Sequence, residues 1–306
     1  MTNAMSRMSI DDARVGVNVL ERVSVGGATV VPLGSAWSAS PAELRESAAA
    51  APFAFAARLL GVEPLLVERQ PIRPTEGGRS FASSRAAAPL HTDSQMFLGA
   101  PAAVQVLVCV KQALRGGESV LVDGTGLLAR LDHDDPALAR ALFAVQRSQR
   151  FYFGEVLGPT LALRGGHLAW TVAPGELGAV DDVGRALIRE LTREPRVEHT
   201  LQPGEALVAS NHRMLHGRGP FEGERELVRL LVWLERPLLA DASQRSRARE
   251  LSPPLPETGL VRLRAVLAIL RGAPPAKVAA GAHVDEATLY AWRDAFMRGG
   301  ASALAS

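Results

Sequence analysis

Cysteine, tyrosine and strong net charge are scarce in this chain of 306 residues, which has one cysteine, two tyrosines and a formal net charge of +2. A single cysteine allows no internal disulfide, so we interpret Cys109, inside the apolar run Val104 to Val110, as a small buried side chain. A charge so close to neutral does not predict a nucleic-acid partner for the whole surface, although a local basic patch is still compatible with it.

Long hydrophobic runs are also missing. The most apolar stretch, Ala48 to Leu60, is interrupted by Pro52 and Arg58 and is too short to span a bilayer. Residues 1–14 contain no apolar segment of the signal-peptide type. We therefore expect a cytoplasmic protein without a membrane partner.

The remaining composition is that of a globular protein, with 47% hydrophobic and 22% charged residues. Many short strand-like segments are separated by Gly/Pro turns and accompanied by a few helices, which predicts a mainly β fold with α decoration (α+β) and a barrel-like or jelly-roll core. Val23 to Leu33 is one predicted strand. The polar, irregular segment from Arg69 to Pro89 is a candidate lid.

The composition changes near Ala240. We expect a main domain over residues 1–240, a polar, basic and proline-rich linker over 241–257, and a small domain over 258–306. Apolar spacing and caps predict three short helices in the small domain, with a tight turn before the last, as in a helix-turn-helix module. Its charge is only modestly positive and the last helix starts with acidic residues, so the sequence leaves DNA binding and protein docking both open.

Two distant segments carry the residues with the most distinctive chemistry. His91 and Asp93 lie two residues apart on one face of an extended segment, and His216 ends a strand far downstream. Two histidines and a carboxylate form the set that holds non-haem Fe(II) and leaves positions open for substrate and oxygen. On the following strand, alternation places Arg225 and Arg229 on one face.

Four segments in order resemble the Fe(II)/2-oxoglutarate-dependent dioxygenases of the taurine dioxygenase (TauD/TfdA) and clavaminate synthase-like family. They are PLHTD at 89–93, GGES at 116–119, NHRMLHGRGPF at 211–221 and REL-x-R at 225–229, and the resemblance covers roughly residues 20–237. It implies a double-stranded β-helix (jelly-roll) core. It also implies Fe(II), 2-oxoglutarate and O2 as cofactor, co-substrate and oxidant.

The resemblance assigns roles to individual residues. His91, Asp93 and His216 would be the metal ligands and the catalytic centre. Arg225 would hold the distal carboxylate of 2-oxoglutarate, with Ser119 adding a hydroxyl group. Residues expected to contact the substrate are Arg229, Gln95 and Phe97. The roles of the two arginines could be exchanged, since the loop that precedes Arg225 looks shorter than in several relatives.

The implied reaction is hydroxylation of an unactivated C–H bond, or a related desaturation or cyclisation, with release of succinate and CO2. Asp93 favours these reactions over halogenation, because halogenating relatives carry a small residue at that position. The expected substrate is a small carboxylate-bearing metabolite, such as an amino acid in specialised biosynthesis. The alternative from another class is a DNA-binding regulator whose main domain senses 2-oxoglutarate or iron, or an oxygenase that modifies nucleic acid.

Taken singly, each of these residues has an ordinary structural interpretation. A lone His–Asp pair is more often a hydrogen-bonded surface pair than a metal site, and the arginines resemble solvated strand charges. The prediction of a metal site depends on the agreement of all four segments. The histidines that match no ligand position are interpreted as structural, and they are His133, His167, His199, His212 and His283.

Overall fold

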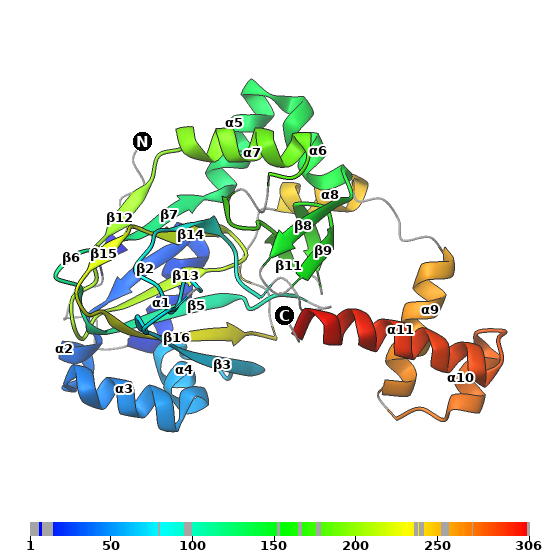
Figure 1. Cartoon of the computed structure of the whole chain (residues 1–306), viewed down its shortest axis with the longest axis horizontal. Helices are drawn as coiled ribbons and strands as arrows, with labels where there is room; N and C mark the ends of the chain where they lie inside the picture. The colour runs from blue at the N-terminus through cyan, green and yellow to red at the C-terminus, as the bar shows by residue number, and fades with distance from the viewer. Residues whose placement is uncertain are drawn as a thin grey trace.

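The computed structural model describes residues 6–7, 15–78, 80–94, 100–151, 154–164, 167–175, 179–235, 238, 242–251, 257–270 and 272–304. Two antiparallel sheets form its centre (Figure 1). The larger sheet has the strand order β1-β2-β13-β5-β16-β3 and the smaller one the order β12-β7-β14-β4. Among the strand pairs of the described residues, the short contact of β1 with β2 is the parallel one. The sequence predicted a mainly β fold with α decoration, and the structure is a mixed α/β fold with antiparallel sheets.

The strands of the larger sheet are β1 (Ser6–Arg7), β2 (Ala28–Val31), β13 (Ala206–Ser210), β5 (Val104–Lys111), β16 (Glu226–Trp233) and β3 (Leu66–Ile72). Those of the smaller sheet are β12 (Val197–His199), β7 (Ser119–Asp123), β14 (Met214–Arg218) and β4 (Ala88–His91). Three short hairpins or pairs complete the strands: β6 (Arg115–Gly116) with β15 (Phe221–Glu222), β8 (Arg147–Phe151) with β9 (Gly154–Gly158), and β10 (Leu161–Arg164) with β11 (His167–Trp170).

The two sheets pack face to face over a shared apolar cluster. Cys109 and Leu227 of the larger sheet meet Leu121 and Met214 of the smaller one in this cluster. Successive side chains of a strand point to opposite faces, so the residues two or four positions from these also point between the sheets. The space between the sheets therefore receives Gln105, Ser119, His216 and Arg229, and these positions carry the functional side chains described below.

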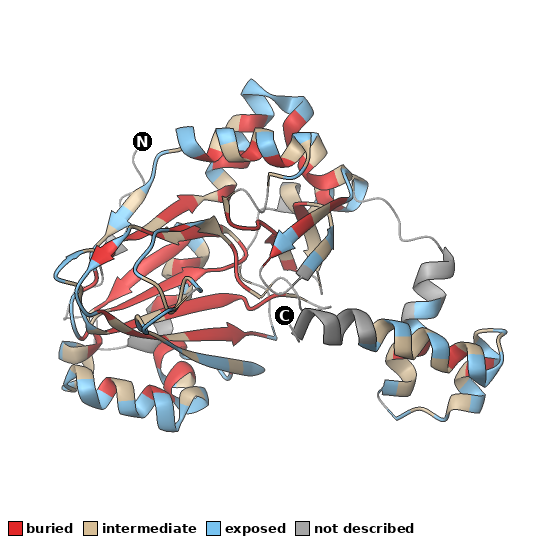
Figure 2. Cartoon of the chain, viewed as in Figure 1, coloured by how far each residue is buried: buried red, intermediate tan, exposed pale blue. Residues whose placement is uncertain are grey.

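Helices cover the outer face of the larger sheet. Val104, Val106 and Val108 of β5 pack there with residues of α1 (Val15–Gly26), α3 (Pro41–Ala50) and α4 (Pro52–Leu60). Both faces of β5 are thus buried, which explains why its sequence is a continuous apolar run rather than an alternating one (Figure 2). The buried Cys109 confirms the interpretation of this residue, and burial raises the pKa of its thiol to about 12.

A second helical layer covers the outer face of the smaller sheet. Val122 and Leu215 pack there against α5 (Gly124–Asp134), α6 (Pro136–Ala144) and α7 (Asp182–Arg193). The layer also contains α8 (Ala242–Leu251), whose Ala248 is fully buried. Residues 241–257 were expected to be a linker, and over α8 they are instead a helix packed on the main domain. Its polar composition misled the prediction because only one narrow face of the helix is buried.

The predicted strand Val23 to Leu33 is wrong at both ends. Helix α1 continues to Gly26, β2 occupies Ala28–Val31, and the short helix α2 (Leu33–Trp37) follows. Gly27 separates helix from strand with a φ of +83°, and a Cβ at this position would lie 2.4 Å from Met214 Sδ. The glycine pair therefore ends a helix, and it does not interrupt a strand.

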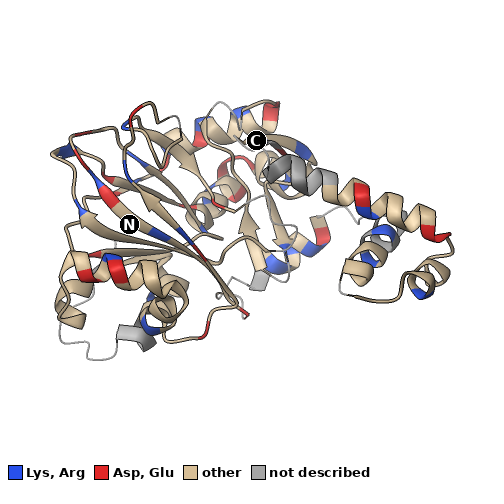
Figure 3. Ribbon diagram, turned by 60° about the horizontal axis from the view of Figure 1, so that its bottom comes forward, with Lys and Arg blue, Asp and Glu red and all other residues tan. Residues whose placement is uncertain are grey.

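Three helices, α9 (Glu257–Leu270), α10 (Pro275–Gly281) and α11 (Glu286–Leu304), follow in the C-terminal part. They pack around Ala265, Ala279 and Leu289, and His283 with a φ of 54° lies in the turn before α11. Acidic as well as basic residues occur along these helices (Figure 3). Among the described residues, no helix combines the length and the apolar character needed to cross a membrane.

Candidate metal centre and adjoining cavity

Neighbouring strands of the smaller sheet bring the two distant sequence segments together. His91 ends β4 and is the register partner of His216 on β14, so the two imidazole rings lie 4.6 Å apart between their centroids. Asp93 follows two residues later. His91 Nε2 lies 3.8 Å from Asp93 Oδ1, and His216 Nε2 lies 3.4 Å from Asp93 Oδ2. Within the described residues this is the group of three potential ligands whose donor atoms all lie within 4.8 Å of one another.

A buried amide holds the carboxylate-bearing residue in place. The Asp93 N–H donates to Asn211 Oδ1 at 2.8 Å, and Asn211 Nδ2 donates back to the Asp93 carbonyl at 3.0 Å. A third bond from Asn211 Nδ2 reaches the Ala102 carbonyl at 2.9 Å. These contacts tie the turn before β14 to the segment that carries His91 and Asp93.

Hydrogen bonds leave the ligand nitrogens facing the carboxylate. His91 Nδ1 lies 2.8 Å from the Pro89 carbonyl, which can only accept, so Nδ1 carries the proton and Nε2 keeps its lone pair. The Gln105 amide nitrogen lies 3.0 Å from His216 Nε2, and an amide nitrogen can only donate. The lone pair of His216 Nε2 therefore also faces the centre of the group.

The protonation states match those of metal ligands. Burial lowers the pKa of His91 to about 4, and the neighbouring His216 adds to this effect. Burial alone would raise the pKa of Asp93, but the Arg229 guanidinium holds it well below its usual value. A neutral imidazole and an ionised carboxylate are the forms that bind Fe(II), so the residues present fit this metal.

Two side chains of the larger sheet contact the same carboxylate. Gln105 Nε2 donates to Asp93 Oδ2 at 2.6 Å. Arg229 Nη1 lies 3.0 Å from Asp93 Oδ1 and 2.8 Å from Oδ2, and its Nη2 donates to the Gln70 side chain. Gln105 was missed by the sequence reasoning. The signal that could have found it is a single glutamine inside an otherwise apolar strand, at a position whose side chain points between the sheets.

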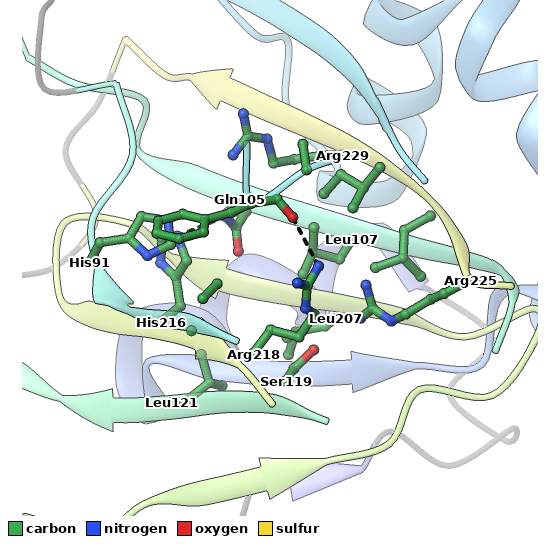
Figure 4. Close-up of a pocket in the computed structure, with 16 residues that line it drawn as sticks. His91, Gln105, Leu107, Ser119, Leu121, Leu207, His216, Arg218, Arg225 and Arg229 are labelled. Carbon is green, nitrogen blue, oxygen red and sulfur yellow. Dashed lines mark hydrogen bonds between the residues drawn. The ribbon is translucent and has the colours of Figure 1, made fainter. Parts of the chain in front are cut away.

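A cavity opens beside this group between the two sheets. The triad histidines lie at one end of the cavity and Arg225 at the other, with Ser119 and Arg218 between them (Figure 4). Apolar side chains such as Leu107, Leu121 and Leu207 form much of the remaining lining. The predicted co-substrate residues Arg225 and Ser119 thus share one cavity with the metal group, and so does Arg229. Gln95 and Phe97 lie outside the described residues.

Arg225 is a buried cation without a carboxylate contact among the ion pairs of the described residues. It is 3% exposed, and no described residue bonds to its Nε. Burial lowers its pKa to about 10, and the neighbouring Arg218 contributes, so the guanidinium keeps its charge at neutral pH. A Cβ on Gly117, which has a φ of +79°, would lie 3.1 Å from Arg225 Nε. A buried guanidinium of this kind is suited to an anionic ligand.

The histidines interpreted as structural lie apart from the metal group. His212 Nε2 bonds to the Pro101 carbonyl at 2.9 Å and stacks edge-on with His167 at 4.9 Å. His199 contacts Glu205, and His133 contacts Asp134 on the surface. None of them belongs to a group of three potential ligands within the described part of the chain.

An antiparallel β fold around two histidines and one carboxylate defines the class of non-haem iron oxygenases. The family model described as "Taurine catabolism dioxygenase TauD, TfdA family" matches residues 50–162 and 172–231, which is more than half of the chain. The chain belongs to this family. The match includes His91, Asp93, Ser119, His216, Arg225 and Arg229.

Individual relatives are more distant. A uridine-5'-phosphate dioxygenase of Amycolatopsis sp is 32% identical over 161 residues, covering 46% of this chain and 56% of that protein. Human gamma-butyrobetaine dioxygenase is 25% identical over 162 residues, covering 46% and 42%. The chain spans about half the length of the curated relatives it matches. The structure of AAD-2 with Mn(II) and N-oxalylglycine superimposes with a TM-score of 0.54 at 15% identity, over 78% of this chain and 98% of that one, and supports the fold.

Proposed function

We propose that this protein is an Fe(II)/2-oxoglutarate-dependent oxygenase that hydroxylates an unactivated C–H bond of a small carboxylate-bearing metabolite. The observation that carries the proposal is the meeting of His91, Asp93 and His216 at one end of a cavity whose other end holds the buried Arg225. Together, bound Fe(II), 2-oxoglutarate and O2 supply the oxidation of the C–H bond, with release of succinate and CO2.

The residues of the cavity divide the remaining work. His91, Asp93 and His216 would hold Fe(II) and leave positions open for co-substrate and oxygen. Arg225 binds the distal carboxylate of 2-oxoglutarate with two parallel hydrogen bonds, and the Ser119 hydroxyl adds a third contact. The apolar lining keeps water from the reacting groups.

We assign the substrate anion to Arg229. A reacting C–H bond must lie beside the metal, and Arg229 contacts the ligand Asp93 at 2.8 Å. Arg225 forms no ion pair with Asp93 or any other described carboxylate. Its place at the other end of the cavity suits the distal carboxylate of a co-substrate that extends away from the metal. The names of the curated relatives point in the same direction, because uridine-5'-phosphate is an anion and gamma-butyrobetaine carries a carboxylate.

Anaerobic addition of Fe(II) and then 2-oxoglutarate tests the proposal. We expect the visible charge-transfer band of the chelate, and we expect it to be lost in Asp93→Ala and His216→Ala. His133→Ala, which changes an exposed histidine on α5, is the matched control and should keep the band. Absence of the band from folded wild-type protein would refute the metal and co-substrate assignment. Its presence would justify a screen of amino acids and other small anions for succinate release.

We also propose, as a second candidate function, that helices α9–α11 bind nucleic acid. The turn at His283 between α10 and α11 supports it, because a tight turn between two short helices is the arrangement of a helix-turn-helix. Leu289 and Trp292 pack in the small cluster of this module, so we assign them to its core and not to base stacking. A gel retardation assay with a salt titration tests DNA binding. A steep salt slope supports phosphate contacts, and no retardation at low salt would leave protein docking as its role.

A further inference from the structure

A third arginine enters the cavity, and the proposed reaction gives it no role. Arg218 lies on β14, two residues after the ligand His216, so its side chain points to the same side of the sheet. It is 8% exposed and lies between the histidines and Arg225 (Figure 4). Burial lowers the pKa of its guanidinium. No ion pair of the described residues includes it.

The hydrogen bonds of Arg218 go to backbone carbonyls, and most of them lie in one segment. Nη1 donates to Phe81 O at 2.9 Å, and Nη2 donates to Ser84 O at 3.2 Å and to Ala86 O. Nε donates to Gly219 O at 3.3 Å. Three carbonyls of a six-residue stretch therefore converge on one planar donor, whose five N–H groups can serve several acceptors at once.

The stretch that Arg218 holds is a wall of the cavity. Phe81, Ala82 and Ala88 belong to the cavity lining, and the Phe81 ring lies 5.8 Å from the ring of the ligand His91. Residues 73–87, between β3 and β4, form no regular secondary structure where the structure describes them. Hydrogen bonds within the segment, such as Thr75 N–H to Ser83 O at 2.9 Å, give it a local shape, and contacts from outside the segment fix its place beside the metal group.

We propose that Arg218 is a positioning residue that holds segment 80–88 as the wall of the cavity and keeps Phe81 against His91. The functional part of this inference rests on the proposed oxygenase activity. A wall held in this way excludes water from the side of the metal group where substrate and oxygen would enter. The candidate lid at Arg69–Pro89 is thereby refined to a shorter segment, fastened from within the cavity.

The chain offers a matched control on the outer side of the same segment. Arg85 Nε donates to Gly223 O at 3.0 Å, and its Nη2 contacts Glu224 at 3.3 Å. The Arg85 side chain is about half exposed and lines no part of the cavity. Exposed contacts of this kind contribute little to stability, so Arg85→Ala should change the order of segment 80–88 far less than a substitution of Arg218.

The proposal is tested by hydrogen exchange on the whole chain carrying Arg218→Lys, Arg218→Gln or Arg85→Ala. Mass spectrometry of peptides covering 80–88 gives the exchange rates of the segment. Lysine keeps the charge but cannot bond to three carbonyls in a plane. We expect both Arg218 variants to exchange in this segment at least about ten-fold faster than wild type, while Arg85→Ala stays close to it. If Arg218→Gln does not fold, Arg218→Lys decides. Exchange at the wild-type rate in Arg218→Lys would overturn the proposal.

A second measurement separates positioning from anion binding. Anaerobic titration of Fe(II)-loaded protein with 2-oxoglutarate should give a Kd for Arg218→Lys within about three-fold of wild type. Succinate release in the absence of substrate should rise several-fold in Arg218→Lys and in Phe81→Ala. A large loss of 2-oxoglutarate affinity with unchanged exchange would make Arg218 an anion-binding residue instead. If wild type forms no chelate band, the oxygenase proposal fails, but the exchange result still decides the role of Arg218.

Discussion

Replacing Asn211 by alanine tests whether one buried amide holds the first ligand segment in its place. Asn211 is fully buried and joins the turn before β14 to Asp93, which lies 118 positions earlier in the chain. Its three hydrogen bonds, at 2.8, 3.0 and 2.9 Å, satisfy the Asp93 N–H and the carbonyls of Asp93 and Ala102. Alanine offers none of these partners.

The expected cost follows from the groups left behind. A buried polar group that loses its partner costs about 1–3 kcal/mol, and a carbonyl with a second partner costs less than an isolated N–H. Three such groups predict a loss of about 3–5 kcal/mol in the free energy of unfolding. This is a large part of the roughly 5–15 kcal/mol typical of a folded protein. The variant should nevertheless still fold at low temperature.

Urea unfolding followed by circular dichroism measures this loss. Gln112→Ala is the matched control, because it removes the same amide group with one bond, Nε2 to Gly116 O at 3.1 Å, and should cost about 1 kcal/mol or less. We also expect Asn211→Ala to weaken Fe(II) binding, since the Asp93 backbone is no longer held. Stability equal to that of Gln112→Ala would refute the reasoning.

Three further predictions concern the cavity and its surroundings. Arg225→Ala should weaken 2-oxoglutarate binding at least ten-fold with little change in Fe(II) affinity, and an effect seen only in Arg229→Ala would reverse the two assignments. Gly117→Ala should also weaken 2-oxoglutarate binding, because its Cβ would lie 3.1 Å from Arg225 Nε; unchanged affinity would show that the arginine adapts. Burial lowers the pKa of His212 from 6.5 to about 4, so its protonation favours the unfolded state. His212 is neutral in both states above pH 6.5 and costs no stability there; the loss of stability grows as the pH falls from 6.5 to 4 and amounts to about 2 kcal/mol at pH 5. Urea unfolding at pH 7.5 and 5 should therefore show a smaller pH effect in His212→Gln than in wild type, and equal pH effects would contradict the assignment.

Local patterns were enough to predict much of the fold. Ser40 caps α3 with a capping box completed by Glu43, and Gly61 ends α4 in a left-handed conformation. The apolar run at 104–110 is a strand buried on both faces. These features depend on neighbours a few residues away, which the sequence displays directly. The predictions failed where local chemistry permits two outcomes, as at the Gly26–Gly27 pair and in the polar helix α8.

The candidate metal ligands were also predictable, because their chemistry is unusual and each segment keeps its order along the chain. The partners of those ligands were not. Asn211 bonds to Asp93, Gln105 contacts His216, and Arg218 bonds to the Phe81 carbonyl, each across more than a hundred residues. The contact of Gln105 with Asp93 is the shorter one in sequence. Such contacts depend on which strands pair and in which register, and a shift of one residue would turn each of these side chains to the opposite face. The sequence by itself determined which residues can bind a metal and which strands alternate, whereas only the packing of two sheets decided which buried polar groups hold them in place.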